Sequence, residues 1–153
     1  MENRPIDQTD REILAALANN ARLSNKELAA RVGLAPSSCH ERVRRLVHDG
    51  AILGFHAAVN PAVLGFGIEA MLAVRLPQHS RQNFDAFRAY VATIPEVVDV
   101  YHVSGEIDFL VHVVARDAQH LRDLALDRFL SRPEVGHIET ELIFDHVRPP
   151  AHA

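Results

Sequence analysis

The fold of the N-terminal third is decided by residues 33–50, which read GLAPSSCHERVRRLVHDG. Gly33 favours a left-handed turn, and Pro36 suits the first turn of a helix, where its missing N–H needs no partner. The spacing predicts a helix over 36–48, turning about 100° per residue. The apolar residues that share its inward face are Cys39, Val43, Leu46 and Val47.

The opposite face of this helix is polar, and it carries the residues that we expect to bind DNA. Serine and arginine side chains bond to base edges, and arginine is the most common partner of guanine. Arginines further along the helix are suited to holding phosphates. The candidate DNA-binding residues are Ser37, Ser38, Glu41, Arg42, Arg44 and Arg45.

Two further helices are predicted ahead of this one. Ser24 and Glu27 form an S-x-x-E capping box, which predicts the start of a short helix that ends near Val32. Apolar residues at helical spacing predict an earlier helix over about 7–19. The order of the short helices is typical of a helix-turn-helix, whose second helix enters the major groove. The segment 52–59 alternates like a β-strand and is expected to form a small hairpin or wing.

Composition leaves a second interpretation of the arginines open. The net charge of −4 is unusual for a DNA-binding protein, and an arginine-rich helix face is often merely solvated. The charge is unevenly divided, because residues 1–60 carry a net +1 and residues 61–153 a net −5. A local cluster of arginines can still engage phosphates while the rest of the chain stays acidic.

The remaining two thirds of the chain alternate between strand and helix patterns. We expect strands over 68–76, 97–104, 108–115 and 135–144, and helices over 80–93 and 118–130. The order β-α-β-β-α-β is the ferredoxin-like plan, in which helices cover one face of an antiparallel sheet. The open face of such a sheet is usually covered by self-association. The whole chain is thus predicted to be α+β, with domains over 1–59 and 68–153 and a linker over 60–67.

The residue pattern favours a binding protein over an enzyme. No nucleophile–base pair, glycine-rich phosphate loop or metal-ligand spacing occurs, so no cofactor or metal is expected. His102 and His112 fall on neighbouring strands, where packed imidazoles are the alternative to a metal role. The single cysteine, Cys39, excludes an internal disulfide and fits a reducing cytoplasm. No apolar run has the length of a membrane span, and no signal peptide is expected.

One segment of the second domain resembles a ligand site. It comprises Val103, Ser104, Gly105, Glu106, Ile107 and Asp108. A glycine in a tight turn exposes backbone N–H groups that can hold a carboxylate, and the aspartate can pair with an ammonium. The alternative is a simple hairpin turn.

Several motifs together resemble the leucine-responsive regulator family (Lrp/AsnC, the feast/famine regulators), from about Ile6 to Val147. They are I-D-x-x-D-R-x-I-L at 6–14, R-L-S-N-x-E-L at 22–28, R-V-G-L-A-P-S-S-C-x-E-R-V-R-R-L at 31–46, G-x-I-x-G-F at 50–55 and V-S-G-x-x-D-F-L at 103–110. His40 is a local departure from the family pattern. The order and spacing of these pieces make the resemblance specific.

The resemblance implies a winged helix-turn-helix followed by a ferredoxin-like effector domain, called the RAM domain. It implies homodimers that pack their sheets face to face and commonly assemble into octamers. It also implies that double-stranded operator DNA is one partner, and that a free amino acid or related metabolite binds between subunits near 104–108. Gly105 and Asp108 carry over directly, and Glu106 occupies a variable position. Two alternatives are an effector-independent architectural DNA-binding protein and a ferredoxin-like metabolite-binding enzyme subunit.

Overall fold

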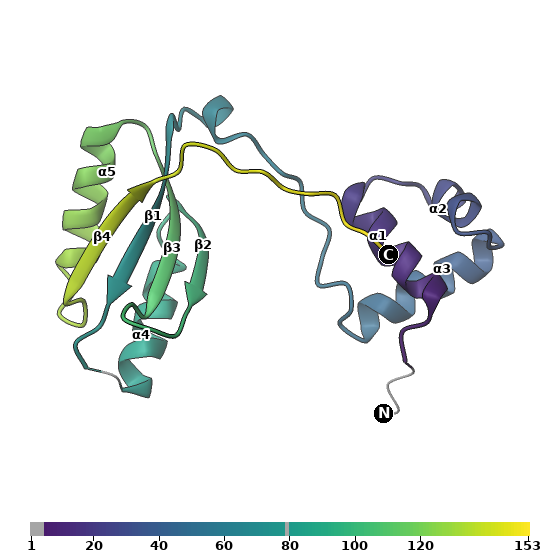
Figure 1. The fold of residues 1–153 in the computed structure, drawn as a ribbon, viewed down its shortest axis with the longest axis horizontal. Helices are drawn as coiled ribbons and strands as arrows, with labels where there is room; N and C mark the ends of the chain where they lie inside the picture. The colour runs from purple at the N-terminus through teal and green to yellow at the C-terminus, as the bar shows by residue number, and fades with distance from the viewer. Residues whose placement is uncertain (1–4, 79) are drawn as a thin grey trace. The chain divides into compact units, whose positions relative to one another are not determined.

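The computed structural model describes residues 5–78 and 80–153, which divide into two compact units. One unit comprises residues 5–58 and 147–153, and the other comprises residues 59–78 and 80–146 (Figure 1). The last seven residues, which the sequence placed with the second domain, thus group with the first unit.

Three helices build the first unit: α1 (Gln8–Asn19), α2 (Asn25–Arg31) and α3 (Pro36–His48). The predicted capping box is present at the start of α2. The Ser24 backbone N–H donates to the Glu27 carboxylate at 2.8 Å, and the Glu27 backbone N–H donates to Ser24 Oγ at 3.2 Å. The Ser24 side chain, and after it the Ser24 backbone N–H, hydrogen-bonds to the Glu27 carboxylate and holds its pKa below its usual value. The local cap therefore begins this helix as the sequence predicted.

The core of the first unit is small and includes the predicted inward face of α3. Cys39 is fully buried and Leu46 is 1% exposed, and both pack with Ile13 of α1 and Leu28 of α2. Burial raises the pKa of the Cys39 thiol, so the side chain behaves as a small apolar group. Val47 was wrongly predicted to face inward, because it is 45% exposed near the end of α3.

The predicted wing is also wrong. Residues 52–59 contain no strand, and the segment leads without regular structure to η1 (Pro61–Leu64). Its alternating apolar side chains stay exposed, as the 94% exposure of Leu53 and the 51% exposure of Phe55 show. A strand needs a neighbour to receive its backbone hydrogen bonds. Within the described part of the chain no strand pairs with this segment, so the alternation alone does not produce a hairpin.

The C-terminal residues are attached to α1 by the side chain of Asn19. Its amide nitrogen donates to the Ala151 carbonyl at 2.8 Å, and its amide oxygen accepts from the Ala151 N–H at 2.9 Å. One side chain thus satisfies both backbone groups of a single residue, much as a neighbouring strand would. This pair joins the tail to the unit with which it groups.

The second unit has the predicted ferredoxin-like arrangement. Its elements are β1 (Ile68–Arg75), α4 (Arg81–Val91), β2 (Val97–His102), β3 (Phe109–Ala115), α5 (Ala118–Leu124) with a π-helical continuation η2 (Ala125–Leu130), and β4 (His137–Leu142). The strands form one antiparallel sheet in the order β2-β3-β1-β4. The helices α4 and α5 lie behind the sheet in Figure 1. The α+β fold class expected from the sequence is confirmed.

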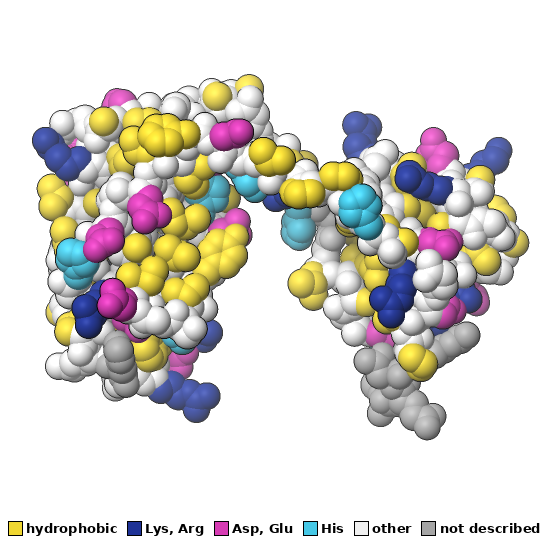
Figure 2. Space-filling model, in the orientation of Figure 1, with side chains coloured by type: hydrophobic (Ala, Val, Ile, Leu, Met, Phe, Trp, Pro, Cys, Tyr) yellow, Lys and Arg dark blue, Asp and Glu magenta, His cyan; other side chains and the backbone are white. Residues whose placement is uncertain are grey.

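The two faces of the sheet differ in what covers them. Alternate residues of β1 and β3, such as Leu72 and Val111, are fully buried against Phe87 of α4 and Phe129 of η2. The intervening residues form the other face, which neither α4 nor α5 covers (Figure 1). Figure 2 shows this face as apolar side chains flanked by acidic ones. By strand register, the open face carries Glu69, Met71, Ala73, Leu110, His112, Val114, Glu139 and Glu141.

Candidate DNA-binding surface and effector loop

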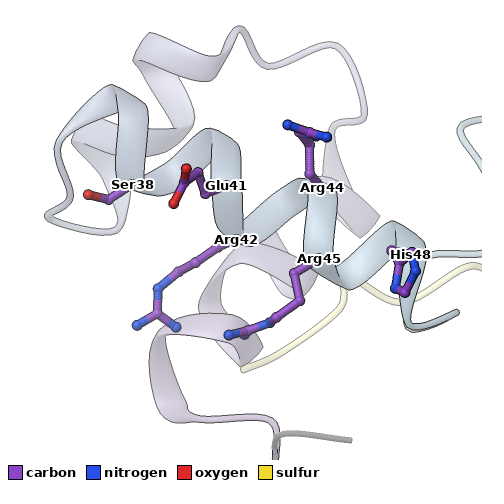
Figure 3. Close-up of a pocket in the computed structure, with 6 residues that line it drawn as sticks. All are labelled: Ser38, Glu41, Arg42, Arg44, Arg45 and His48. Atoms are coloured by element: carbon purple, nitrogen blue, oxygen red, sulfur yellow. The ribbon is translucent and has the colours of Figure 1, made fainter. Parts of the chain in front are cut away.

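The polar face of α3 lines a shallow hollow of about 560 Å³ on the first unit. The hollow brings together five of the six predicted DNA-binding residues, and Ser37 is exposed in the first turn beside it. His48 also lines it, and its spacing of three and four residues from Arg45 and Arg44 was the signal for this position. The lining residues are Ser38, Glu41, Arg42, Arg44, Arg45 and His48 (Figure 3).

The three arginines of α3 fall into two groups. Arg44 is exposed and points away from the other two in Figure 3. Arg42 and Arg45 extend side by side in the opposite direction, and their side chains are only 23% and 25% exposed. Helical periodicity had placed Arg45 on the outer face, opposite the core. The Arg45 side chain differs from this expectation because the orientation of a long side chain depends on its ion-pair partner as well as on the direction of its Cα–Cβ bond.

The partners of these two arginines lie on α1. Arg42 Nη1 lies 2.6 Å from an Asp7 carboxylate oxygen and 2.8 Å from an Asp10 oxygen, and Arg45 Nη2 lies 2.5 Å from the second Asp10 oxygen. The Asp10 side chain is fully buried. Asp7, and after it Asp10, raises the pKa of the Arg42 guanidinium. The buried Asp10 carboxylate thus orients two of the candidate DNA-binding residues, Arg42 and Arg45. The sequence did not predict this role of Asp10.

These ion pairs leave each arginine able to donate further hydrogen bonds. A guanidinium has five N–H donors, and the ion pairs with Asp7 and Asp10 use one terminal nitrogen of each side chain. The same side chains therefore join α1 to α3 and present a fixed cationic edge beside Arg44. A guanidinium group that is already held in one orientation loses little conformational entropy when it binds a phosphate or a base edge.

The predicted effector loop is the connection between β2 and β3. Ser104, Gly105 and Glu106 are exposed at its tip, and Gly105 has a φ of 127°, which favours glycine. The Val103 N–H donates to the Asp108 carbonyl at 2.9 Å and closes the loop. Val103 and Ile107 are half-buried. The tip of the loop therefore exposes its polar backbone groups, and the two ends of the loop are held together by this hydrogen bond.

Asp108 has a structural task at the base of this loop. It is 7% exposed, and its carboxylate accepts a hydrogen bond from the Leu76 N–H at 2.7 Å. Its own N–H donates to the Val74 carbonyl at 2.9 Å. The aspartate therefore pins the loop to the end of β1. The sequence had placed this residue in the loop but had not predicted this contact.

The two histidines considered for a metal role lie on opposite sides of the sheet. His102 stacks against Phe109 on the helix side, with ring centroids 4.8 Å apart. His112 lies on the open face, with Nε2 3.0 Å from a Glu69 carboxylate oxygen. Among the described residues, no group of three or more histidine, cysteine or acidic side chains is arranged to hold a metal ion.

A search of the helices in residues 5–78 and 80–153 finds none that is both long and apolar enough to cross a membrane.

Family profiles match both units. The AsnC-type helix-turn-helix domain matches residues 6–47, and the Lrp/AsnC ligand binding domain matches residues 69–151. These ranges contain α1, α2 and most of α3 in the first case, and the sheet with the loop 103–108 in the second. The match thus covers the two regions in which the candidate sites lie.

Known proteins resemble the chain over nearly its whole length. The HTH-type transcriptional regulator AldR of Mycolicibacterium smegmatis is 43% identical, over 95% of this chain and 85% of that protein. The crystal structure of MtbAldR is 38% identical with a TM-score of 0.80, covering 95% of this chain and 97% of that one. A transcriptional regulator of Neisseria meningitidis in complex with L-Met is 29% identical with a TM-score of 0.87, covering 95% and 94%. The chain therefore belongs to the Lrp/AsnC family, and it is a ligand-responsive, DNA-binding transcriptional regulator.

Proposed function

We propose that α3 enters the major groove of operator DNA and that a free amino acid bound near the loop 103–108 regulates this binding. The observation that carries the proposal is the exposed polar face of α3, where Ser38 and Arg44 stand beside a cationic edge fixed by Asp10. In this arrangement Ser37, Ser38 and Glu41 face the bases, and the arginines hold bases or phosphates. The chain acts by binding and not by catalysis, in keeping with relatives named as transcriptional regulators.

The regulator is proposed to work as a homo-oligomer. One short recognition helix makes too few contacts for tight specific binding, so a dimer presents two helices to half-sites about one turn of DNA apart. The open face of the sheet supports this assembly, because its apolar centre at Met71, Ala73 and Leu110 lies on the side of the sheet away from α4 and α5. Dimers that assemble further, up to octamers, add more helices along the DNA.

The effector is proposed to be a free amino acid or a related small metabolite. The exposed backbone around Gly105 can receive a carboxylate, and the exposed side chain of Glu106 can receive an ammonium. The support is the ligand-binding profile that spans this loop and the L-Met present in the similar Neisseria structure. The effector changes DNA affinity only to the extent that it binds two assembly states with different affinity.

Fluorescence anisotropy with DNA from upstream of the gene for this protein tests the proposal. The titration is run at fixed salt, against random DNA of equal length, with and without a panel of free amino acids that includes L-methionine. We expect tight binding to the upstream DNA that at least one amino acid shifts by about fivefold or more. Arg44→Ala is expected to weaken this binding, and Arg122→Ala, an exposed arginine of the second unit, serves as its matched control.

The outcomes separate the possible functions. Binding that no amino acid shifts, with little sequence preference and a steep salt dependence, describes an architectural DNA-binding protein and rejects the effector proposal. Binding to upstream DNA no tighter than to random DNA, together with equal affinities for the Arg44 and Arg122 variants, rejects α3 as the reading element.

A further inference from the structure

The second unit contains a cavity that the proposed function does not use. Its volume is about 420 Å³, within the range of small-molecule sites. One wall is a single face of α4, and the other consists of the residues at which β2 ends and β3 begins. The lining residues among those described are Arg81, Phe84, Asp85, Arg88, His102 and Phe109.

Three rings form the inner surface of this cavity. The His102 ring lies nearly parallel to the Phe109 ring, with centroids 4.8 Å apart and an interplanar angle of 22°. Phe84 contacts both of them, with centroid distances of 4.9 Å to His102 and 5.9 Å to Phe109. The cluster is partly open, because Phe109 is buried, Phe84 is half-buried and His102 is exposed. Such a surface accepts a further flat ring by offset or tilted stacking.

Two guanidinium groups stand at the rim of the same cavity. Arg81 and Arg88 are seven residues apart on α4, so they share one face of the helix with Phe84 and Asp85. Asp85 lies 2.9 Å from Arg88, and both side chains are more than half exposed. The described lining therefore carries two permanent positive charges and one negative charge. The surplus favours an anion above the aromatic surface.

We propose that this cavity binds a small organic acid in which a carboxylate is attached to a flat aromatic or heteroaromatic ring. The ring stacks on the cluster of Phe84, His102 and Phe109, and the carboxylate pairs with Arg81 and Arg88. An isolated arginine pair would accept any anion, and an isolated aromatic cluster would accept any flat ring. Their combination in one cavity selects a molecule that has both features.

The site is separate from the tip of the effector loop but adjoins its base. His102 and Phe109 are partners in the register of β2 and β3, and they directly precede and follow residues 103–108. A ligand that packs on both rings thus stabilises the strand ends that carry the loop. The proposal does not depend on whether the loop itself binds an amino acid.

Isothermal titration calorimetry of the full-length protein with benzoate tests this site. Benzamide serves as the uncharged analogue, and inorganic phosphate serves as an anion without a ring. We expect saturable benzoate binding, with benzamide and phosphate each weaker by about tenfold or more. The double variant R81Q/R88Q is expected to weaken benzoate binding by a similar factor. R122Q, at an exposed arginine of α5, is the matched control and is expected to bind as the unaltered protein does.

Three results would overturn the proposal: no saturable benzoate binding, equal benzoate affinity in R81Q/R88Q and R122Q, or phosphate binding as tight as benzoate binding. Urea denaturation of both variants shows that the second unit remains folded, which is expected because the substituted side chains lie at the surface. A second variant, F84L, keeps an apolar side chain and removes only the ring, so it is expected to weaken benzoate binding and leave phosphate binding unchanged. DNA binding is measured separately, so failure here leaves the proposed function untouched.

Discussion

Asp10 and Asp108 are the buried charged residues in the described part of the chain, and each lies at one of the two candidate sites. Asp10, in the first unit, is surrounded by charge, because both of its oxygens pair with arginines of α3. Asp108, in the second unit, accepts a backbone N–H at the end of β1. The first aspartate fixes side chains that are proposed to touch DNA, and the second fixes the loop that is proposed to hold the effector.

The difference between these aspartates concerns what remains after each is removed. Without Asp10, Arg45 loses its ion-pair partner and Arg42 keeps only Asp7, while about three quarters of each arginine side chain stays shielded from water. Without Asp108, a neutral N–H loses one acceptor. An uncompensated charge costs more free energy than an unsatisfied amide. The first unit is therefore expected to depend on its aspartate more heavily than the second unit does.

The largest expected effect is that of Asp10→Ala. The variant leaves Arg42 and Arg45 without their shared partner, and we expect it to lower the free energy of unfolding of the first unit by about 3–5 kcal/mol. Urea denaturation monitored by helical circular dichroism measures this loss. Glu12→Ala, on the same helix, removes a carboxylate that accepts a hydrogen bond from the Gln8 side chain and is the control. Equal midpoints for the two variants would contradict the central role of Asp10.

Asp108→Ala is expected to have a smaller effect on stability. Loss of the acceptor for the Leu76 N–H is expected to lower the free energy of unfolding of the second unit by roughly 1–3 kcal/mol. Because the loop loses its anchor, the response to the amino-acid effector is expected to weaken while basal DNA binding persists. Urea denaturation measures the stability, and anisotropy titrations with and without effector measure the response of DNA binding. Asp108→Asn, which keeps one oxygen acceptor, is expected to retain more stability, and an unaltered dose response in Asp108→Ala would refute the anchor role.

A comparison of Arg44 with Arg45 sharpens the distinction between binding and stability within α3. Arg44→Ala is expected to weaken DNA binding and to reduce the slope of log affinity against log salt by about one, while stability changes by roughly 0.5 kcal/mol or less. Arg45→Ala removes an ion pair with buried Asp10, so it is expected to weaken DNA binding and stability together and to leave the oligomer intact. Anisotropy at several salt concentrations, urea denaturation and light scattering make these measurements. If Arg45→Ala changes only DNA affinity, its ion pair has no structural role.

The smallest expected effect lies at the exposed start of α2. Ser24→Ala removes the cap of this helix and is expected to lower the melting temperature by a few degrees. The Ser24 side chain, and after it the Ser24 backbone N–H, lowers the pKa of Glu27 in the folded state. The stability that Glu27 contributes is therefore present at neutral pH and is lost as the pH falls through its lowered pKa. In Ser24→Ala this loss on acidification is expected to shrink, and an identical pH dependence of the melting temperature in both proteins would exclude the linkage.

The elements that the sequence predicted well are those with local signals. The capping box at Ser24, the turn at Gly33 and the proline at the start of α3 each act within one helical turn, and the structure has all three. The alternation of strands and helices in the second unit was equally clear, because each strand had a partner elsewhere in the same pattern. The segment 52–59 had the strand pattern but no such partner, and its prediction was wrong.

Contacts between residues that are distant in the sequence could not be predicted from these local signals. Asp10 lies more than thirty residues from Arg42 and Arg45, so their pairing depends on how α1 docks on α3. A helical projection treats each side chain as pointing straight outward, and a long arginine turns toward the nearest carboxylate instead. The same limit applies to Asp108, whose acceptor role appears only when the loop meets the end of β1.

The buried cysteine provides a way to measure how often the first unit opens. Cys39 is the single thiol of the chain and is fully buried in the small core of the three helices. A thiol reagent in solution can react with Cys39 only when that core opens. Its labelling rate therefore measures the opening of the first unit and does not report on the second unit. Labelling in the presence of operator DNA or of an amino acid would then show which ligand suppresses the opening of the three helices, without the introduction of any further cysteine.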